Sequence, residues 1–256
     1  MKKIATPLEK TLEFAKTHYG AKTNIFGTLL FEHCANVARQ AETIAQRLYQ
    51  DVRADCNQDS TKESVLAIIQ VALLHDVLNT SACAFENIAE TATVQVAAMV
   101  ADISRDFRLV ETKRDMEFRG RLSQSPVAAQ IVVVADIICT ANEALRFLQA
   151  GGLPAVPKSK KILTQLDGDL LAIHAASRYY ILRLFVHAAR NLIGEISQKI
   201  KDCRHKAKIE KFLSQSTKKL RDRVEQQNKA KSGKKTKAKK KEVRYAKKRI
   251  NDKDTD

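Results

Sequence analysis

The sequence contains few residues that break helices and few that favour strands. Its 256 residues include only 8 glycines, 4 prolines and 5% aromatic residues. It has no apolar run near the length of about 18 residues that a transmembrane helix needs, and the opening MKKIATPLEK has two lysines without an apolar stretch after them. We therefore expect an all-α protein with no signal peptide and no membrane span.

The cysteines also lack a pattern. There are five, and no C-x-x-C pair is present: Cys34, Cys56, Cys83, Cys139 and Cys203. An odd, scattered set is typical of reduced thiols in a reducing compartment. We therefore expect a cytoplasmic chain without structural disulfides.

Positive charge is concentrated at one end of the chain. Residues 1–198 carry 22 Lys/Arg against 21 Asp/Glu, whereas residues 199–256 carry 23 against 8. Residues 229–249 alone hold 12 Lys/Arg and one acid. Such a run repels itself and buries little, so we expect it to be disordered when free. It is a solubilising end, a sequence-independent attachment to nucleic acid, or an attachment to an anionic membrane surface.

Apolar residues recur at helical spacing through most of the chain. In residues 29–50 they are Val37, Ala41, Ile44, Ala45 and Leu48, which predicts an amphipathic helix. We expect further helices at 63–77, 86–104, 125–152, 163–188 and 189–227, a polar loop at 51–62, and core positions for His174 and His187. The state of 111–124 is left open. The resulting division is a domain at 1–150, a helical extension at 151–228 and the basic tail at 229–256.

Four polar residues stand where core residues would be expected. His33 begins the first amphipathic helix. In VALLHDVLNT, His75 and Asp76 follow the apolar residues 71–74. Asp136 interrupts the apolar run IVVVADIIC. Singly, each has an ordinary reading: a helix end in water, a satisfied core histidine, or a salt bridge to an arginine. Together, on separate expected helices, they form a set that can hold a divalent cation.

Four segments matter here, in chain order GTLLFEHC, ALLHDVLNT, MVADISRD and AAQIVVVADII; all but MVADISRD contain one or two of these residues. In that order they resemble the motifs G-x-P-Y-x-x-H-P, A-L-L-H-D-x-V-E-D-T, V-x-x-V-T-x-D and A-x-x-V-K-L-A-D-x-x. These motifs belong to the hydrolase domain of the RelA/SpoT-type alarmone enzymes, within the HD superfamily of metal-dependent phosphohydrolases. The resemblance spans about residues 14–148 and implies an HD-domain helical bundle, here with additional C-terminal helices.

The resemblance also implies a set of site residues. The family's ligand positions hold manganese, which assigns Mn²⁺ or another divalent transition metal to His33, His75, Asp76 and Asp136. Lys22 approximates the family's basic residue that packs on the nucleotide base. Lys113 and Arg114, with Arg119 and Arg121 nearby, lie between the last two ligand-bearing helices. They either hold phosphates or form a solvated charged face.

The sequence departs from the family at several positions. The Glu-Asp pair that positions and activates water is replaced by Asn79 and Thr80, and neither is a general base at neutral pH. The lysine of V-K-L-A-D is Val133, and the asparagine four residues after the last ligand is Thr140. The catalytic residues therefore stay unassigned.

Two functions follow from this pattern. The first is a phosphohydrolase acting on a nucleotide or related phosphorylated small molecule, which the complete ligand set favours. The second is a catalytically weak or inactive sensor or scaffold, tethered to nucleic acid by residues 229–249, which the missing Glu-Asp pair favours. No synthetase motif accompanies the hydrolase-like region.

Overall fold

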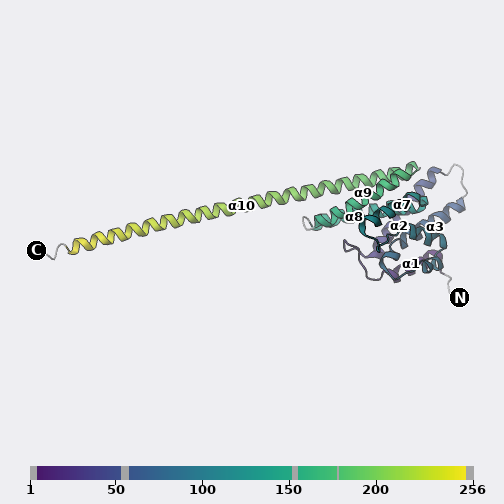
Figure 1. Ribbon diagram of the computed structural model, residues 1–256, viewed down its shortest axis with the longest axis horizontal. Coiled ribbons are helices and arrows are strands. Elements are labelled where there is room, and N and C mark those ends of the chain that lie inside the picture. Colours follow the sequence, from purple (N-terminus) through teal and green to yellow (C-terminus); the bar gives the residue numbers. More distant parts are fainter. Residues whose placement is uncertain (1–4, 53–57, 152–154, 178, 252–256) are drawn as a thin grey trace. The chain divides into compact units, whose positions relative to one another are not determined.

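The computed structural model describes the backbone of residues 5–52, 58–151, 155–177 and 179–251, and the side chains of 5–50, 64–151, 155–177, 179–215 and 217–219. Over these residues the regular structure is helical, apart from an isolated bridge between Thr23 and Leu29. The predicted all-α class is confirmed (Figure 1). The helices are α1 (Pro7–Tyr19), α2 (Leu30–Val52), α3 (Gln58–Leu74), α4 (Val77–Thr80), α5 (Phe85–Thr91), α6 (Val94–Asp102), α7 (Glu111–Gln124), α8 (Val127–Gly151), α9 (Val156–Ala176) and α10 (Tyr180–Asn251).

Helices α2, α3 and α8 pack against one another and form the centre of the core. The apolar positions predicted for α2 are all buried, and α8 is buried continuously from Ala129 to Ala135. Because these helices meet along apolar faces, a polar group on one of them is brought close to the other two. The site described below arises in this way.

The segment between α1 and α2 is held in one conformation by its own hydrogen bonds. The Asn24 Oδ1 accepts from the backbone N–H groups of Phe26 and Thr28. Gly27 has a φ of 88°, a conformation that suits glycine because a Cβ would be strained there. Residues 23–29, called the Asn24 loop here, lead directly into α2, and the last of them lies four residues before His33.

Several sequence predictions about helix boundaries are wrong. The loop expected at 51–62 overlaps the end of α2 at Val52 and the start of α3 at Gln58, and its residues 53–57 lie outside the described residues. The helix expected at 63–77 ends at Leu74. The helix expected at 86–104 is two helices, because the Thr93 side chain caps α6 by accepting from the backbone N–H of Val96. The helices expected at 163–188 and 189–227 are α9 and α10, which separate between Ala176 and Tyr180, where no glycine or proline marks the break.

His174 and His187 are exposed rather than in the core. The buried residues of α9 include Leu166, Leu170 and Ile173, and His174 lies off that face. His187 in turn follows the buried Val186 on α10.

The contacts divide the chain into two compact units, Met1–Cys203 and Arg204–Asp256. The first unit extends beyond the boundary expected after residue 150, and the division into three parts stays a prediction. The backbone of the basic segment is helical through Asn251 as part of α10, where we expected no regular structure. Lysine, arginine and alanine have high helix propensity, which accounts for the helix; disorder of the free tail stays a prediction. None of the described helices is long and apolar enough to cross a bilayer.

Candidate metal centre

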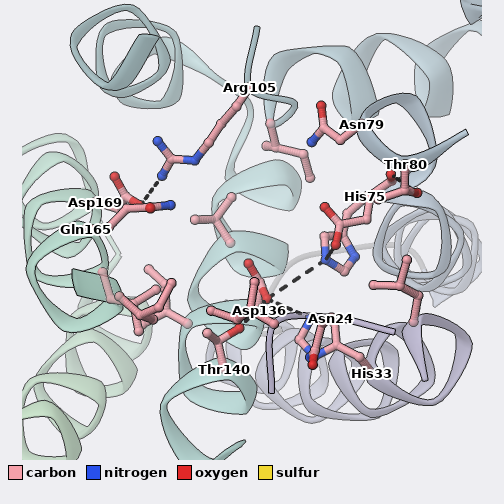
Figure 2. Close-up of a pocket in the computed structure, with 18 of the residues that line it drawn as sticks. Asn24, His33, His75, Asn79, Thr80, Arg105, Asp136, Thr140, Gln165 and Asp169 are labelled. Carbon is pink, nitrogen blue, oxygen red and sulfur yellow. Dashed lines mark hydrogen bonds and ion pairs between the residues drawn. The ribbon is translucent and has the colours of Figure 1, made fainter. Parts of the chain in front are cut away.

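Three helices bring the ligand candidates together. His33 lies in the first turn of α2, His75 directly follows α3, and Asp136 lies in the middle of α8. One ligand atom from each falls within 4.8 Å of the other two. Figure 2 shows these side chains converging at one end of a cavity. Residues separated by 103 positions in the sequence are therefore neighbours in the fold.

The distances within the cluster are short. The Nε2 of His33 lies 3.0 Å from Asp136 Oδ1, and the Nε2 of His75 lies 3.9 Å from the same oxygen. The two imidazole side chains are almost completely buried, and the Asp136 side chain is 32% exposed toward the cavity. Among the described residues, Asp136 pairs with these histidines and with Thr140, whose Oγ1 donates to it at 3.0 Å, instead of the arginine that the alternative reading required.

Asp76 lies beside this cluster without completing it. Its Oδ2 is 3.7 Å from His75 Nε2, and its side chain is 31% exposed. It is not one of the three residues whose ligand atoms all lie within 4.8 Å of one another. Its role as a fourth ligand stays a prediction.

Hydrogen bonds orient both imidazole rings. The His75 Nδ1 is 2.7 Å from the Ala72 carbonyl oxygen, which can only accept, so Nδ1 donates. The His33 Nδ1 is 2.9 Å from Oε1 of Glu143, a buried residue of α8. The Nε2 atoms are therefore the ones that face Asp136. This is the arrangement in which a histidine presents a lone pair to a metal while its other nitrogen is held by a second group.

Glu143 was missed by the sequence reasoning. It lies seven residues after Asp136 on α8, which places the two carboxylates on the same face two turns apart. Its other oxygen accepts from the side-chain amide of Asn24. A second carboxylate at that spacing in an otherwise apolar helix was the available signal.

The carboxylates around His33 shift its proton affinity. Burial lowers the pKa of His33, but hydrogen bonds to Asp136 and Glu143 outweigh burial and raise it to about 10. For Asp136 the balance is the opposite one. Burial raises the pKa of its carboxyl group, but the hydrogen bond from His33 and the charge of His75 outweigh burial and lower the pKa to about 2. The cluster is thus built to hold positive charge between its carboxylates. Two imidazole nitrogens with carboxylate oxygens suit a divalent transition metal, so the residues fit the cation implied by the motifs.

The cavity beside the cluster has a volume of about 390 Å³. The candidate ligands lie at one end, and Arg105, Gln165 and Asp169 lie across from them (Figure 2). The surface between these ends is largely apolar. Asn79 and Thr80 also line the cavity, and the Thr80 hydroxyl donates to the Asp76 carbonyl oxygen at 2.7 Å.

The predicted substrate-binding residues lie outside this cavity wall. Lys22 donates to the carbonyl oxygens of His18 and Thr80. Lys113 is exposed on α7, and the Arg114 guanidinium stacks on the Phe107 ring at 4.8 Å. None of the three lines the cavity, and their role stays a prediction.

Two further basic residues make structural contacts. Arg119 pairs with Asp169, and Arg121 donates to carbonyl oxygens at the end of α6. The sequence reasoning overlooked Arg105, the basic residue that does line the cavity. It follows MVADIS in the third motif, where nothing distinguished it from a surface arginine.

Neither protein-family profiles nor curated protein sequences match this chain. A solved structure does match it, and is described as a metazoan ortholog of SpoT that hydrolyses ppGpp. The two chains are 16% identical, with a TM-score of 0.50, over 74% of this chain and 96% of that chain. At this identity the likeness establishes the fold alone. The chain therefore shares the all-α fold of a SpoT-type ppGpp hydrolase, and the resemblance found in its motifs is confirmed at that level.

Proposed function

We propose that this chain is a divalent-metal-dependent phosphohydrolase of the HD type, which acts on a nucleotide or a related phosphorylated small molecule. One observation carries the proposal: His33 on α2, His75 just after α3 and Asp136 on α8 converge at the end of a cavity. Manganese is the cation we propose, from the motif resemblance. The neighbour described as hydrolysing ppGpp supports a phosphorylated nucleotide as the class of substrate.

The proposed chemistry divides between the cation and the chain. When bound, a divalent cation supplies a Lewis acid for a phosphate oxygen and an acidified water. The chain orients the ligands through the Ala72 carbonyl, Glu143 and Thr140. Apolar side chains form much of the cavity lining beside these ligands. Asn79 and Thr80 cannot remove a proton at neutral pH, so the chain supplies less general-base catalysis than the family pattern does.

The test is turnover by the purified full-length chain of a nucleotide panel that includes guanosine tetraphosphate and NADPH. Manganese is added, and release of phosphate, pyrophosphate or nucleoside is measured. Turnover that needs the metal supports the enzyme. Metal binding without any turnover favours the second candidate, a sensor or scaffold, which the side chains of Asn79 and Thr80 support.

A cytoplasmic location belongs to the same proposal. Cys34, Cys83, Cys139 and Cys203 are free thiols, and Cys56 lies outside the residues whose side chains are described. Free thiols support a reducing compartment.

Replacing Glu143 by alanine is expected to weaken manganese affinity about tenfold or more, since groups that orient metal-bound histidines contribute roughly 10–100-fold. Without Glu143 the His33 ring loses the partner that fixes its Nδ1–H. Glu143→Gln should recover part of the loss, because its amide oxygen can still accept from Nδ1. Isothermal titration with manganese measures the effect, and Glu90→Ala, on the exposed side of α5, is the control. Equal affinities for wild type and Glu143→Ala would refute the assignment.

Hydrolysis of guanosine tetraphosphate by the native chain is expected to be weak, because Asn79 and Thr80 replace the Glu-Asp pair. The double variant Asn79→Glu, Thr80→Asp should raise kcat on this substrate about tenfold or more, since positioned general bases typically contribute at least that much. Its KM should rise as well, because the variant adds two carboxylates to the cavity lining. Steady-state kinetics at fixed free manganese give kcat and KM separately. Strong native turnover, with no gain in the double variant, would show that these positions are unimportant.

A further inference from the structure

Positive charge is scarce in the cavity that holds the candidate metal centre. Arg105 is the only lysine or arginine among its described lining residues, against the carboxylates of Asp76, Asp136 and Asp169. Three carboxylates and one guanidinium leave the lining at −2 when the histidines are neutral. A divalent cation would bring it only to zero. Little positive charge then remains for a substrate with several phosphate groups.

Arg105 is itself held by acidic groups. Its Nη1 lies 2.6 Å from Asp115, and its Nη2 pairs with Asp169. The guanidinium also stacks on the Phe118 ring at 4.0 Å, and the side chain is only 12% exposed. Arg105 is thus neutralised on two sides and is poorly placed to clamp a phosphate.

The basic side chains around the cavity are engaged as well. Arg119 pairs with Asp169 at 3.1 Å, and Arg121 is bound to backbone carbonyl oxygens of α6 and the residues after it. Lys22 is held by the carbonyl oxygens of His18 and Thr80. A site for polyphosphate normally presents such groups free for bidentate contact.

Between the candidate ligands and Arg105 the wall is largely apolar. Phe26, Phe107, Phe118, Ile162 and Leu166 line it, and Phe107 is 62% exposed. Aromatic and aliphatic surfaces of this kind accept a base or another flat apolar group. The cavity therefore offers one charged end, at the candidate ligands, and an apolar remainder.

We propose that this cavity selects a phosphomonoester with an aromatic or apolar body, of the kind of a nucleoside monophosphate, over polyphosphorylated nucleotides. The inference rests on the proposed phosphohydrolase function and narrows its substrate class. In the reaction, the oxygen of water bonds to phosphorus and the ester P–O bond breaks. The leaving oxygen takes up a proton, which gives an alcohol and orthophosphate.

The experiment compares guanosine and adenosine monophosphates, diphosphates and triphosphates with guanosine tetraphosphate on the full-length chain. Free manganese is held constant, because polyphosphates chelate it. We expect kcat/KM for the monophosphates to exceed that for every polyphosphate by about tenfold or more, since an uncompensated charge near other negative groups costs at least that factor. A polyphosphate that is turned over as well as the monophosphates overturns the inference and leaves the hydrolase intact.

Binding is measured for the same nucleotides by isothermal titration. If none is turned over, the hydrolase proposal fails, yet the order of affinities still decides the selectivity. Monophosphates that bind more tightly than polyphosphates support the inference, and the reverse order refutes it.

Asp169→Asn removes a negative charge from the lining and releases Arg105 and Arg119. It should shift the ratio of triphosphate to monophosphate kcat/KM toward the triphosphate by about tenfold. Asp167→Asn, on the same helix but outside the cavity lining, is the matched control and should leave the ratio unchanged. A thermal melt checks that both variants are folded; if Asp169→Asn is not, the wild-type comparison decides the question alone. An unchanged ratio in a folded Asp169→Asn argues against selection by charge.

Discussion

Replacing His75 and Asp76 together by alanine is expected to abolish binding of the divalent cation. The wild-type chain should hold about one transition-metal ion, as a single site of this type does. The variant retains only His33 and Asp136, which lie 3.0 Å apart and satisfy each other as an ion pair. Metal content after dialysis against manganese, measured by mass spectrometry, gives the result directly.

The same substitution should remove the stabilisation that the metal gives. A ligand at about 100 times its Kd stabilises the folded state by about 2.7 kcal/mol. A chelator should therefore lower the melting temperature of the wild type and leave that of the variant unchanged. This difference separates loss of metal from loss of packing around the buried His75. The control replaces His174 and Asp167, neither of which lines the cavity; unchanged metal content in the His75/Asp76 variant would remove the basis for the site.

If the basic tail attaches the chain to nucleic acid, deleting residues 229–256 should abolish binding to RNA and DNA. Residues 229–249 carry a net charge of +11, with Tyr245 as their only aromatic residue. Such a segment attracts phosphate backbones and has little with which to read bases, so binding should be independent of sequence. It should also weaken steeply with salt, since each neutralised phosphate adds roughly −0.9 to the slope of log affinity against log salt.

Fluorescence anisotropy at two salt concentrations measures the effect for both chains. A second variant separates the effect of charge from that of tail length. It keeps the full chain and replaces six lysines by glutamine: Lys234, Lys235, Lys237, Lys239, Lys240 and Lys241. It should lose most of the affinity as well, whereas turnover of small substrates should stay the same in all three chains. Affinity that is equal with and without the tail, or indifferent to salt, would contradict nucleic-acid attachment.

The parts of the fold that were predicted correctly are those in which apolar residues recur at helical spacing within one helix. The spacing of Val37, Ile44 and Leu48 was enough to predict α2 and its buried face. The break between α9 and α10 was missed because it has no glycine or proline. At the break between α5 and α6 the Thr93 hydroxyl accepts from the Val96 backbone N–H. A threonine can make such a bond or lie inside a continuous helix, so the residue type alone does not predict the break.

For the site, the sequence identified polar residues that lie among apolar neighbours or within recognisable motifs. Asp136 is conspicuous in an apolar helix, and His33 and His75 were recognised through motifs. Glu143 and Arg105 were missed because what they do depends on which side chain faces them. Glu143 has a role only because α2 places His33 opposite it. Arg105 is held at the cavity by partners from other helices, Asp169 on α9 and Asp115 on α7.

The Asn24 loop contacts both Glu143, which orients His33, and the cavity. Asn24 donates to Glu143, which holds His33, while its neighbours Ile25 and Phe26 form part of the cavity wall. We therefore expect a molecule bound against Ile25 or Phe26 to affect, through these two hydrogen bonds, the orientation of the His33 ring that faces Asp136. By thermodynamic linkage the effect is reciprocal: the change that a bound molecule makes in cation affinity equals the change that the cation makes in the affinity for that molecule. If this coupling is present, occupancy of the cavity and occupancy of the metal centre are two linked equilibria.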